Sequence, residues 1–228
     1  TVWKTRSAQL QIREGGIPKA IVSTDTRFCP QFSADLMQAA LPLVLHESPR
    51  RLLLLGLQGG VTLETCTRFP LEEMTCVESD AGLIRLVNGV VNSETPYDLF
   101  NDDRVRLLPM DPAVAIVADD NYYDVIISSP DQPALAQSAP YFTLEFYRHA
   151  AARLAEGGIF CQRFQYVDFG PEPLRVIAKT MLSAFTTVTA VETASGELAL
   201  LGTNSSRGLL RDGLIDRVQA PHVRDVLS

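Results

Sequence analysis

Short apolar runs alternate with helical patterns through the middle of the chain. The runs Leu52–Leu55 and Met74–Val77 enclose a helical pattern over Val61–Phe69. A strand that is apolar throughout is typical of a parallel sheet covered on both faces, and two parallel strands need a crossover helix between them. Further strand patterns follow at Arg104–Pro109, Tyr123–Ser128 and Ile159–Phe164. The alternation predicts an α/β fold with a doubly wound, mostly parallel sheet.

Helical stripes and antiparallel patterns account for the rest of the chain. Residues 1–30 alternate weakly around Gly15-Gly16, which predicts a short β-hairpin, so we divide the chain into a hairpin segment at 1–30 and one domain at 31–228. The spacing in 209–227 predicts one or two short helices, after a closing antiparallel pair at Thr186–Val191 and Leu198–Leu201. Helices are expected at Phe32–His46 (broken near Pro42), Ala81–Val91, Pro112–Val117, Thr143–Leu154 (ended by Gly157-Gly158) and Pro171–Phe185.

Composition and charge narrow the classes of function. With 228 residues, of which 46% are hydrophobic and 21% charged, the chain is long enough for one large core. The net charge of −7 argues against a nucleic-acid partner, which needs a basic face. The four cysteines lack the paired spacing of a metal site, so we expect no metal centre and mostly buried, reduced thiols. No apolar run approaches the roughly 20 residues of a membrane span, so we expect none in this chain.

The glycine-rich turn after the first central strand is the main candidate for ligand binding. Gly56, Gly59 and Gly60 stand where the chain and a ligand must approach closely. Glu78 ends the next strand, 22 residues after Gly56, which is the distance at which Rossmann-like folds place a carboxylate on the ribose hydroxyls of a nucleotide. We therefore expect an adenosine-type ligand over the carboxyl ends of the strands.

Two further positions lie at the same predicted edge. Asp111 follows the third strand, where it can accept a hydrogen bond from an adenine amino group or cap the helix that starts at Pro112. These two roles do not exclude each other. The fourth strand ends in the loop 129–133, and ligands of open parallel sheets bind beyond the carboxyl ends of the strands. This loop is where we expect chemistry.

The order of motifs resembles the spermidine/spermine synthase family, which is built on the S-adenosylmethionine-dependent methyltransferase fold. The resemblance is closest to a bacterial branch in which this domain is fused behind a membrane transporter-like region. It rests on seven motifs: Leu41-Pro42-Leu43 with His46 and Pro49, the loop Gly56 to Gly60, Val77-Glu78, Asn101-Asp102-Asp103-Arg104-Val105, Asp124-Val125-Ile126-Ile127, Phe142-Thr143 with Glu145-Phe146-Tyr147, and Gly157-Gly158-Ile159-Phe160 with Gln162.

The resemblance implies a seven-stranded sheet, a sulfonium nucleoside and an amine. The nucleoside is S-adenosylmethionine or its decarboxylated form, with methylthioadenosine as product of the latter. The family's catalytic aspartate falls at Ser128 or Ser129 of this chain, which makes Asp131 our candidate for the catalytic carboxylate. The resemblance also implies a homodimer and a cytoplasmic location, either free or as the cytoplasmic domain of a membrane protein. The implied nucleoside-binding positions are Gly56, Gln58, Gly59, Gly60, Glu78, Asp111 and Ser128.

Two functions remain open at this point. The first is a transferase that moves an aminopropyl or methyl group to a small amine. The alternative is a catalytically degenerate domain that acts as a ligand sensor or as a structural, dimerising module, which the serines in place of the aspartate favour. A hydroxyl without a partner cannot act as a general base near neutral pH.

Overall fold

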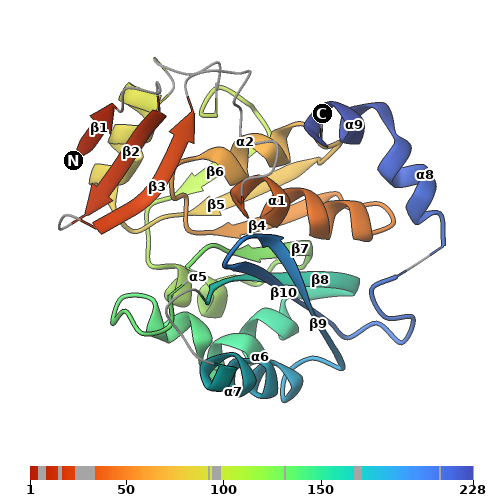
Figure 1. Cartoon of the computed structure of the whole chain (residues 1–228). Helices are drawn as coiled ribbons and strands as arrows, with labels where there is room; N and C mark the ends of the chain where they lie inside the picture. Colours follow the sequence, from red (N-terminus) through yellow and green to blue (C-terminus); the bar gives the residue numbers. More distant parts are fainter. Residues whose placement is uncertain are drawn as a thin grey trace.

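The computed structural model describes residues 1–4, 9–14, 17–23, 34–91, 93, 99–130, 132–166, 171–210 and 212–227. Its centre is a seven-stranded sheet in the order β6-β5-β4-β7-β8-β10-β9 (Figure 1). The first five of these strands are parallel, and β10 and β9 are antiparallel. The predicted fold class is therefore confirmed. The strands are β4 (Arg51–Leu55), β5 (Glu73–Val77), β6 (Val105–Leu108), β7 (Tyr123–Ser128), β8 (Leu154–Gln165), β9 (Thr187–Ala194) and β10 (Glu197–Thr203).

Helices cover both faces of this sheet, because successive side chains of each strand point to opposite sides. In β4, Leu52 and Leu54 enter one buried cluster, and Leu53 and Leu55 enter the other. Helices α5, α6 and α7 lie on one side of the sheet, and α1 and α2 lie on the other (Figure 1). The helices are α1 (Ala34–Leu45), α2 (Val61–Thr67), α3 (Ala81–Leu86), α5 (Pro112–Ala118), α6 (Leu144–Ala152), α7 (Pro171–Leu182), α8 (Leu214–Gln219) and α9 (Pro221–Leu227), with the 3-10 turn η3 (Ala139–Phe142) before α6.

Helix α1 continues through Pro42, where the sequence predicted a break. Proline has no backbone N–H, so the carbonyl of Gln38 cannot form its usual helical bond there. That carbonyl instead lies 3.7 Å from the thiol of Cys161, which donates to it from β8. His46, the last residue of the predicted helix, is buried after the end of α1, and its Nδ1 accepts a hydrogen bond from the backbone N–H of Ser48.

Two other boundaries differ from the predicted ones. Strand β8 starts at Leu154 and passes through Gly157-Gly158, which we interpreted as a helix stop before a strand at Ile159. The left-handed φ of +77° at Gly157 coincides with a shift in the register of β8 against β7, so this glycine forms a bulge within the strand. The predicted helix Ala81–Val91 divides into α3 and a π-helical turn, η2 (Val87–Val91).

The N-terminal hairpin is confirmed, and a third strand extends it. Strands β2 (Gln9–Glu14) and β3 (Ile17–Ser23) pair antiparallel, and β1 (Val2–Lys4) pairs with β2. The domain boundary at residue 30 stays a prediction, because 24–33 lie outside the described residues. Within the described ranges, none of the helices has both the length and the apolar character needed to cross a bilayer.

Candidate functional site

The carboxyl ends of β4, β5, β6 and β7 meet at one edge of the sheet and bring the predicted ligand-binding positions together. Strand pairing places Leu55 beside both Val77 and Ser128, and Val77 beside Leu108. The segments that follow these strands contain the glycine turn, Glu78, Asp111 and Ser129. Open parallel sheets bind their ligands at such an edge.

The glycine turn needs the backbone freedom that its sequence provides. Gly56 and Gly60 have left-handed φ values of +98° and +85°. A Cβ at Gly56 would lie 3.2 Å from the Cβ of Ser129, and one at Gly60 would lie 2.6 Å from Leu99. Gln58 also has a positive φ, +51°, which is uncommon for a residue with a side chain. The turn therefore holds the start of α2 close to the end of β7.

Glu78 fixes this turn from the neighbouring strand. Its side chain is buried, with 9% of the residue exposed. One carboxylate oxygen, Oε2, accepts a hydrogen bond from the backbone N–H of Leu57 at 3.0 Å, and Oε1 accepts one from Asp80 at 2.9 Å. A carboxylate has about four lone-pair sites, so these two hydrogen bonds leave part of its accepting capacity unused. Glu78 thus anchors the turn, and its contact with a ligand stays a prediction.

Asp111 caps helix α5, which confirms one of its two predicted roles. Its Oδ1 accepts hydrogen bonds from the backbone N–H groups of Ala113 at 2.8 Å and Val114 at 3.2 Å. The side chain is exposed at the edge of the sheet, so the second role, contact with a ligand, stays a prediction.

Tyr141 is a residue of this edge that the sequence analysis missed. It lies in η3 and is 7% exposed. Burial, together with the smaller effect of the negative charges of Asp111 and Glu78, raises the pKa of its phenol to about 12. The hydroxyl therefore lies within electrostatic reach of both acids and stays protonated near neutral pH. The only signal in the sequence was an aromatic pair, Tyr141-Phe142, before the helix cap Thr143.

Ser128 and Ser129 lie at the junction between the glycine turn and the loop after β7. Both are fully buried, and among the described residues their Oγ atoms have no hydrogen-bond partner. The backbone N–H of Ser129 donates to Leu55 at 2.9 Å, and its carbonyl accepts from Nε2 of Gln58 at 3.4 Å. Asp131, the candidate catalytic carboxylate, lies outside the described residues.

A buried ion cluster stands next to this junction, and the sequence analysis missed it. Arg163 of β8 contacts Oδ1 of Asp35 through one terminal nitrogen. Its Nε and other terminal nitrogen donate to the two carboxylate oxygens of Glu197, at 3.0 and 3.2 Å. Asp35 and Glu197 are 128 and 34 residues away from Arg163 in sequence, so no local sequence pattern predicts the cluster.

The buried cysteines are reduced thiols, as the sequence predicted. Cys66, Cys76 and Cys161 are free and buried, and burial raises the pKa of each thiol well above its ordinary value. Cys29 lies outside the described residues. Thiols held in this protonated form are poor nucleophiles and poor metal ligands, so these three belong to the core.

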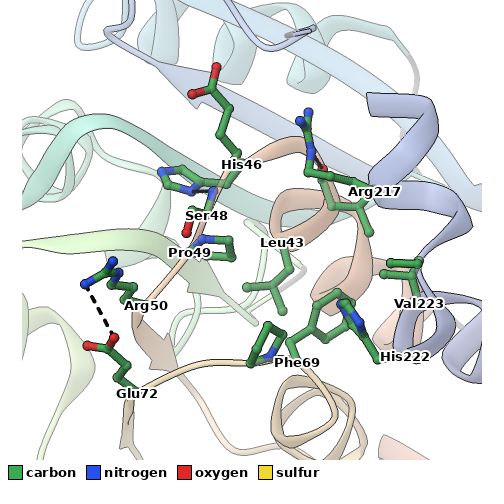
Figure 2. A pocket seen from close by; sticks show the side chains of 14 residues that line it. Leu43, His46, Ser48, Pro49, Arg50, Phe69, Glu72, Arg217, His222 and Val223 are labelled. Carbon is green, nitrogen blue, oxygen red and sulfur yellow. Dashed lines mark hydrogen bonds and ion pairs between the residues drawn. The ribbon is translucent and has the colours of Figure 1, made fainter. Parts of the chain in front are cut away.

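A cavity of about 330 Å³ opens at the opposite edge of the sheet, near the amino ends of the strands (Figure 2). Arg50, just before β4, and Glu72, just before β5, form an ion pair of 3.5 Å across its mouth. The C-terminal helices close another side. The Nε of Arg217 donates to the carbonyl of Val44 at 2.8 Å, near the end of α1. This cavity lies between α1 and the C-terminal helices, and no residue of the glycine turn lines it.

Comparison with known proteins identifies the family. A family model described as the spermine/spermidine synthase domain matches residues 31–197. The chain belongs to this family. Within the spermine/spermidine synthase family, the polyamine aminopropyltransferase of Sodalis glossinidius is 31% identical over 141 residues, which are 61% of this chain and 48% of that protein. The polyamine aminopropyltransferase of Ruegeria sp. is 29% identical over 161 residues, 68% of this chain and 56% of that protein. This chain thus spans about half the length of these two relatives.

Solved structures of the family share the fold. A crystal structure of spermidine synthase in complex with the transition-state analogue AdoDATO superposes with a TM-score of 0.76 at 21% identity, covering 90% of this chain and 69% of that one. The spermidine synthase of Thermotoga maritima gives a TM-score of 0.74 at 20% identity, covering 90% and 68%. The expected membership of the spermidine/spermine synthase family is therefore confirmed. Fusion to a transporter-like region stays a prediction.

Proposed function

We propose that this chain binds decarboxylated S-adenosylmethionine, or S-adenosylmethionine itself, and transfers an aminopropyl or methyl group to a small amine. The observation that supports this most directly is Glu78, a buried carboxylate that anchors the glycine turn and keeps accepting positions at the sheet edge. Membership of the spermine/spermidine synthase family, and the names of its two polyamine aminopropyltransferase relatives, favour the aminopropyl group.

The residues at the edge suit an adenosine-type nucleoside. Gly56 and Gly60 allow the turn its left-handed backbone conformation and its close packing against Ser129 and Leu99. In the proposal, Glu78 accepts the ribose hydroxyls and Asp111 accepts a hydrogen bond from the adenine amino group. Ser128 and Ser129 offer buried hydroxyls without partners in the described part of the chain, and such groups favour a polar ligand or water nearby.

The chemistry proposed for this site is an in-line displacement. The sulfonium nucleoside supplies an electrophilic carbon. As the amine nitrogen bonds to this carbon, the bond between the carbon and sulfur breaks, and the electron pair stays on sulfur. The leaving group is methylthioadenosine in aminopropyl transfer, or the corresponding thioether in methyl transfer. The protein positions the two reactants and removes one proton from the nitrogen. We propose Asp131 for the proton transfer, because it is the nearest carboxylate in sequence to the end of β7.

Calorimetry tests the binding half of this proposal. Titrations of the chain with methylthioadenosine, S-adenosylmethionine and its decarboxylated form should give saturable binding of at least one of the three. A transfer assay with putrescine and the decarboxylated nucleoside then tests the chemistry, and Asp131→Asn should lower kcat much more than it changes the nucleoside Kd. Absence of binding by all three nucleosides would reject the proposal.

We also propose a homodimer in the cytoplasm. The reduced state of the three buried thiols supports a reducing compartment. Light scattering on the purified chain should give twice the mass of 25.0 kDa. A single-chain mass would reject the dimer and leave the nucleoside proposal unaffected.

A further inference from the structure

The cavity at the amino ends of the strands combines an apolar wall with a pair of opposite charges (Figure 2). Its volume of about 330 Å³ lies at the lower end of the range of small-molecule sites, about 300–1,000 Å³, so it has room for one small molecule. Three parts of the chain form the apolar wall: the end of α1, the turn after α2, and α9. The apolar residues of the wall are Leu43, Val44, Phe69, Pro70 and Val223.

Contacts between the elements hold this wall in place. The ring of His222 in α9 meets the ring of Phe69 edge to face, with 5.6 Å between the ring centroids. Arg217 in α8 donates to the carbonyls of Val44 and Leu45 at 2.8 and 3.4 Å, which fastens the C-terminal helices to the end of α1. The fold therefore builds the cavity before any ligand enters it.

The ion pair between Arg50 and Glu72 at the mouth is fixed at its backbone and loose at its side chains. The backbone N–H of Glu72 donates to the carbonyl of Arg50 at 2.8 Å, and the N–H of Arg50 donates to the carboxylate of Asp124 at 2.8 Å. The two side chains are 66% and 65% exposed, and their charged atoms are 3.5 Å apart. Such an exposed ion pair contributes little to stability, so a ligand can separate the two side chains at small cost.

The two charges decide which kind of ligand can replace this pair. A ligand with only a carboxylate would bind Arg50 and leave Glu72 without its cation, and a ligand with only an ammonium group would do the reverse. A zwitterion pairs with both residues at once. Glu47, another acid of the lining, pairs with Arg207 at 3.0 Å. The mouth and the wall together therefore suit a molecule with adjacent opposite charges and an apolar body.

We propose that this cavity binds an α-amino acid with an apolar side chain. The carboxylate pairs with Arg50, the ammonium group pairs with Glu72, and the side chain packs against Phe69 and Val223. This second site does not rest on the proposed transferase function, because no residue of the glycine turn lines the cavity.

Three probes with the same ring test the charge rule: L-phenylalanine, 3-phenylpropionate, which lacks the ammonium group, and 2-phenylethylamine, which lacks the carboxylate. Ligand-detected NMR titrations give the Kd of each. L-Phenylalanine should bind about tenfold more tightly than either of the other two. Arg50→Gln should weaken the binding of L-phenylalanine and 3-phenylpropionate but not of the amine. Glu72→Gln should weaken the binding of L-phenylalanine and the amine but not of 3-phenylpropionate.

Arg68→Gln is the matched control, because Arg68 precedes Phe69, pairs with Glu64 at 3.2 Å and does not line the cavity. It should leave all three Kd values unchanged. Ala220→Phe places a ring at a lining residue and should abolish binding of all three probes, and urea unfolding checks that each variant folds. If L-phenylalanine does not bind the unmodified chain, if the three probes bind equally, or if the folded Ala220→Phe variant binds as before, the amino-acid site is rejected.

Discussion

Replacement of Glu78 by alanine separates the two roles of this carboxylate. The side chain accepts two backbone hydrogen bonds, from Leu57 at 3.0 Å and Asp80 at 2.9 Å, and we propose that it also accepts the ribose hydroxyls. Glu78→Ala leaves the buried N–H of Leu57 without its acceptor, which should lower the free energy of unfolding by about 1–3 kcal/mol. A domain of ordinary stability, about 5–15 kcal/mol, stays folded after such a loss.

The expected loss of nucleoside affinity follows from the charge on Glu78. A hydrogen bond to a charged acceptor contributes about 1.5–3 kcal/mol. Removal of that bond should raise the Kd for methylthioadenosine about 10- to 100-fold. Calorimetry measures the Kd, and urea unfolding measures the stability of the same sample.

Asp80→Ala is the matched control, two residues further along the chain. Asp80 caps α3 by accepting from Gly82 at 2.7 Å and Leu83 at 3.1 Å. Its removal should cost about 1 kcal/mol of stability, as the loss of a helix cap usually does, and should leave the Kd unchanged. If Glu78→Ala folds and binds methylthioadenosine as tightly as the unmodified chain, the ribose role of Glu78 is wrong and only its anchoring role remains.

Three further outcomes follow from the described contacts. Gly60→Ala should lower the free energy of unfolding by at least about 1 kcal/mol, because residue 60 has a left-handed φ of +85° and a Cβ there would lie only 2.6 Å from Leu99. Gly89→Ala is the control: its Cβ meets no atom within 4 Å, so thermal unfolding should change little. Asp111→Ala removes the cap of α5 and should cost about 1 kcal/mol in urea unfolding; an unchanged midpoint would contradict the capping bonds. The side-chain hydrogen bond from Arg104 holds the pKa of Asp102 below its usual range, so the bond stabilises the fold above about pH 4 and is lost as the pH falls through the lowered pKa. Asp102→Asn should therefore be less stable than the unmodified chain at pH 7, and the difference in urea unfolding should shrink as the pH falls through that lowered pKa.

The sequence was most informative where local pattern and burial agree. Strand β7 has the bounds that the apolar run Tyr123–Ser128 predicted, and β4 and β5 each start one residue earlier than expected. These strands are covered on both faces, so apolar residues fill most of their length, and the charged residues Arg51, Glu73 and Asp124 stand at or next to their amino ends. The glycine turn and the cap at Asp111 are also local features, because their backbone and side-chain demands fall within a few residues.

Other features depend on partners that are distant in the chain. The bulge at Gly157 uses the same residue type as a helix stop, and only pairing with β7 distinguishes the two. Helix α1 continues through Pro42, and the carbonyl of Gln38 that the proline leaves free accepts from Cys161 on a distant strand. Arg163 stands within the predicted strand Ile159–Phe164 with no local sign of its partners, and only the fold brings Asp35 and Glu197 to it. A single sequence contains no record of such non-local contacts.

Ser129 contacts the glycine turn and also stands in the loop where we expect the amine. In the proposed reaction, this one residue therefore affects the binding of both substrates. Residue 129 lies where any Cβ at residue 56 would press on it, and its carbonyl also holds Gln58. A substitution at 129 intended to change the choice of amine would therefore also displace the loop that receives the nucleoside. Directed evolution of amine selectivity should accordingly keep Gly56 and vary residues 58 and 129 together, because changes at 129 alone also act on the glycine turn.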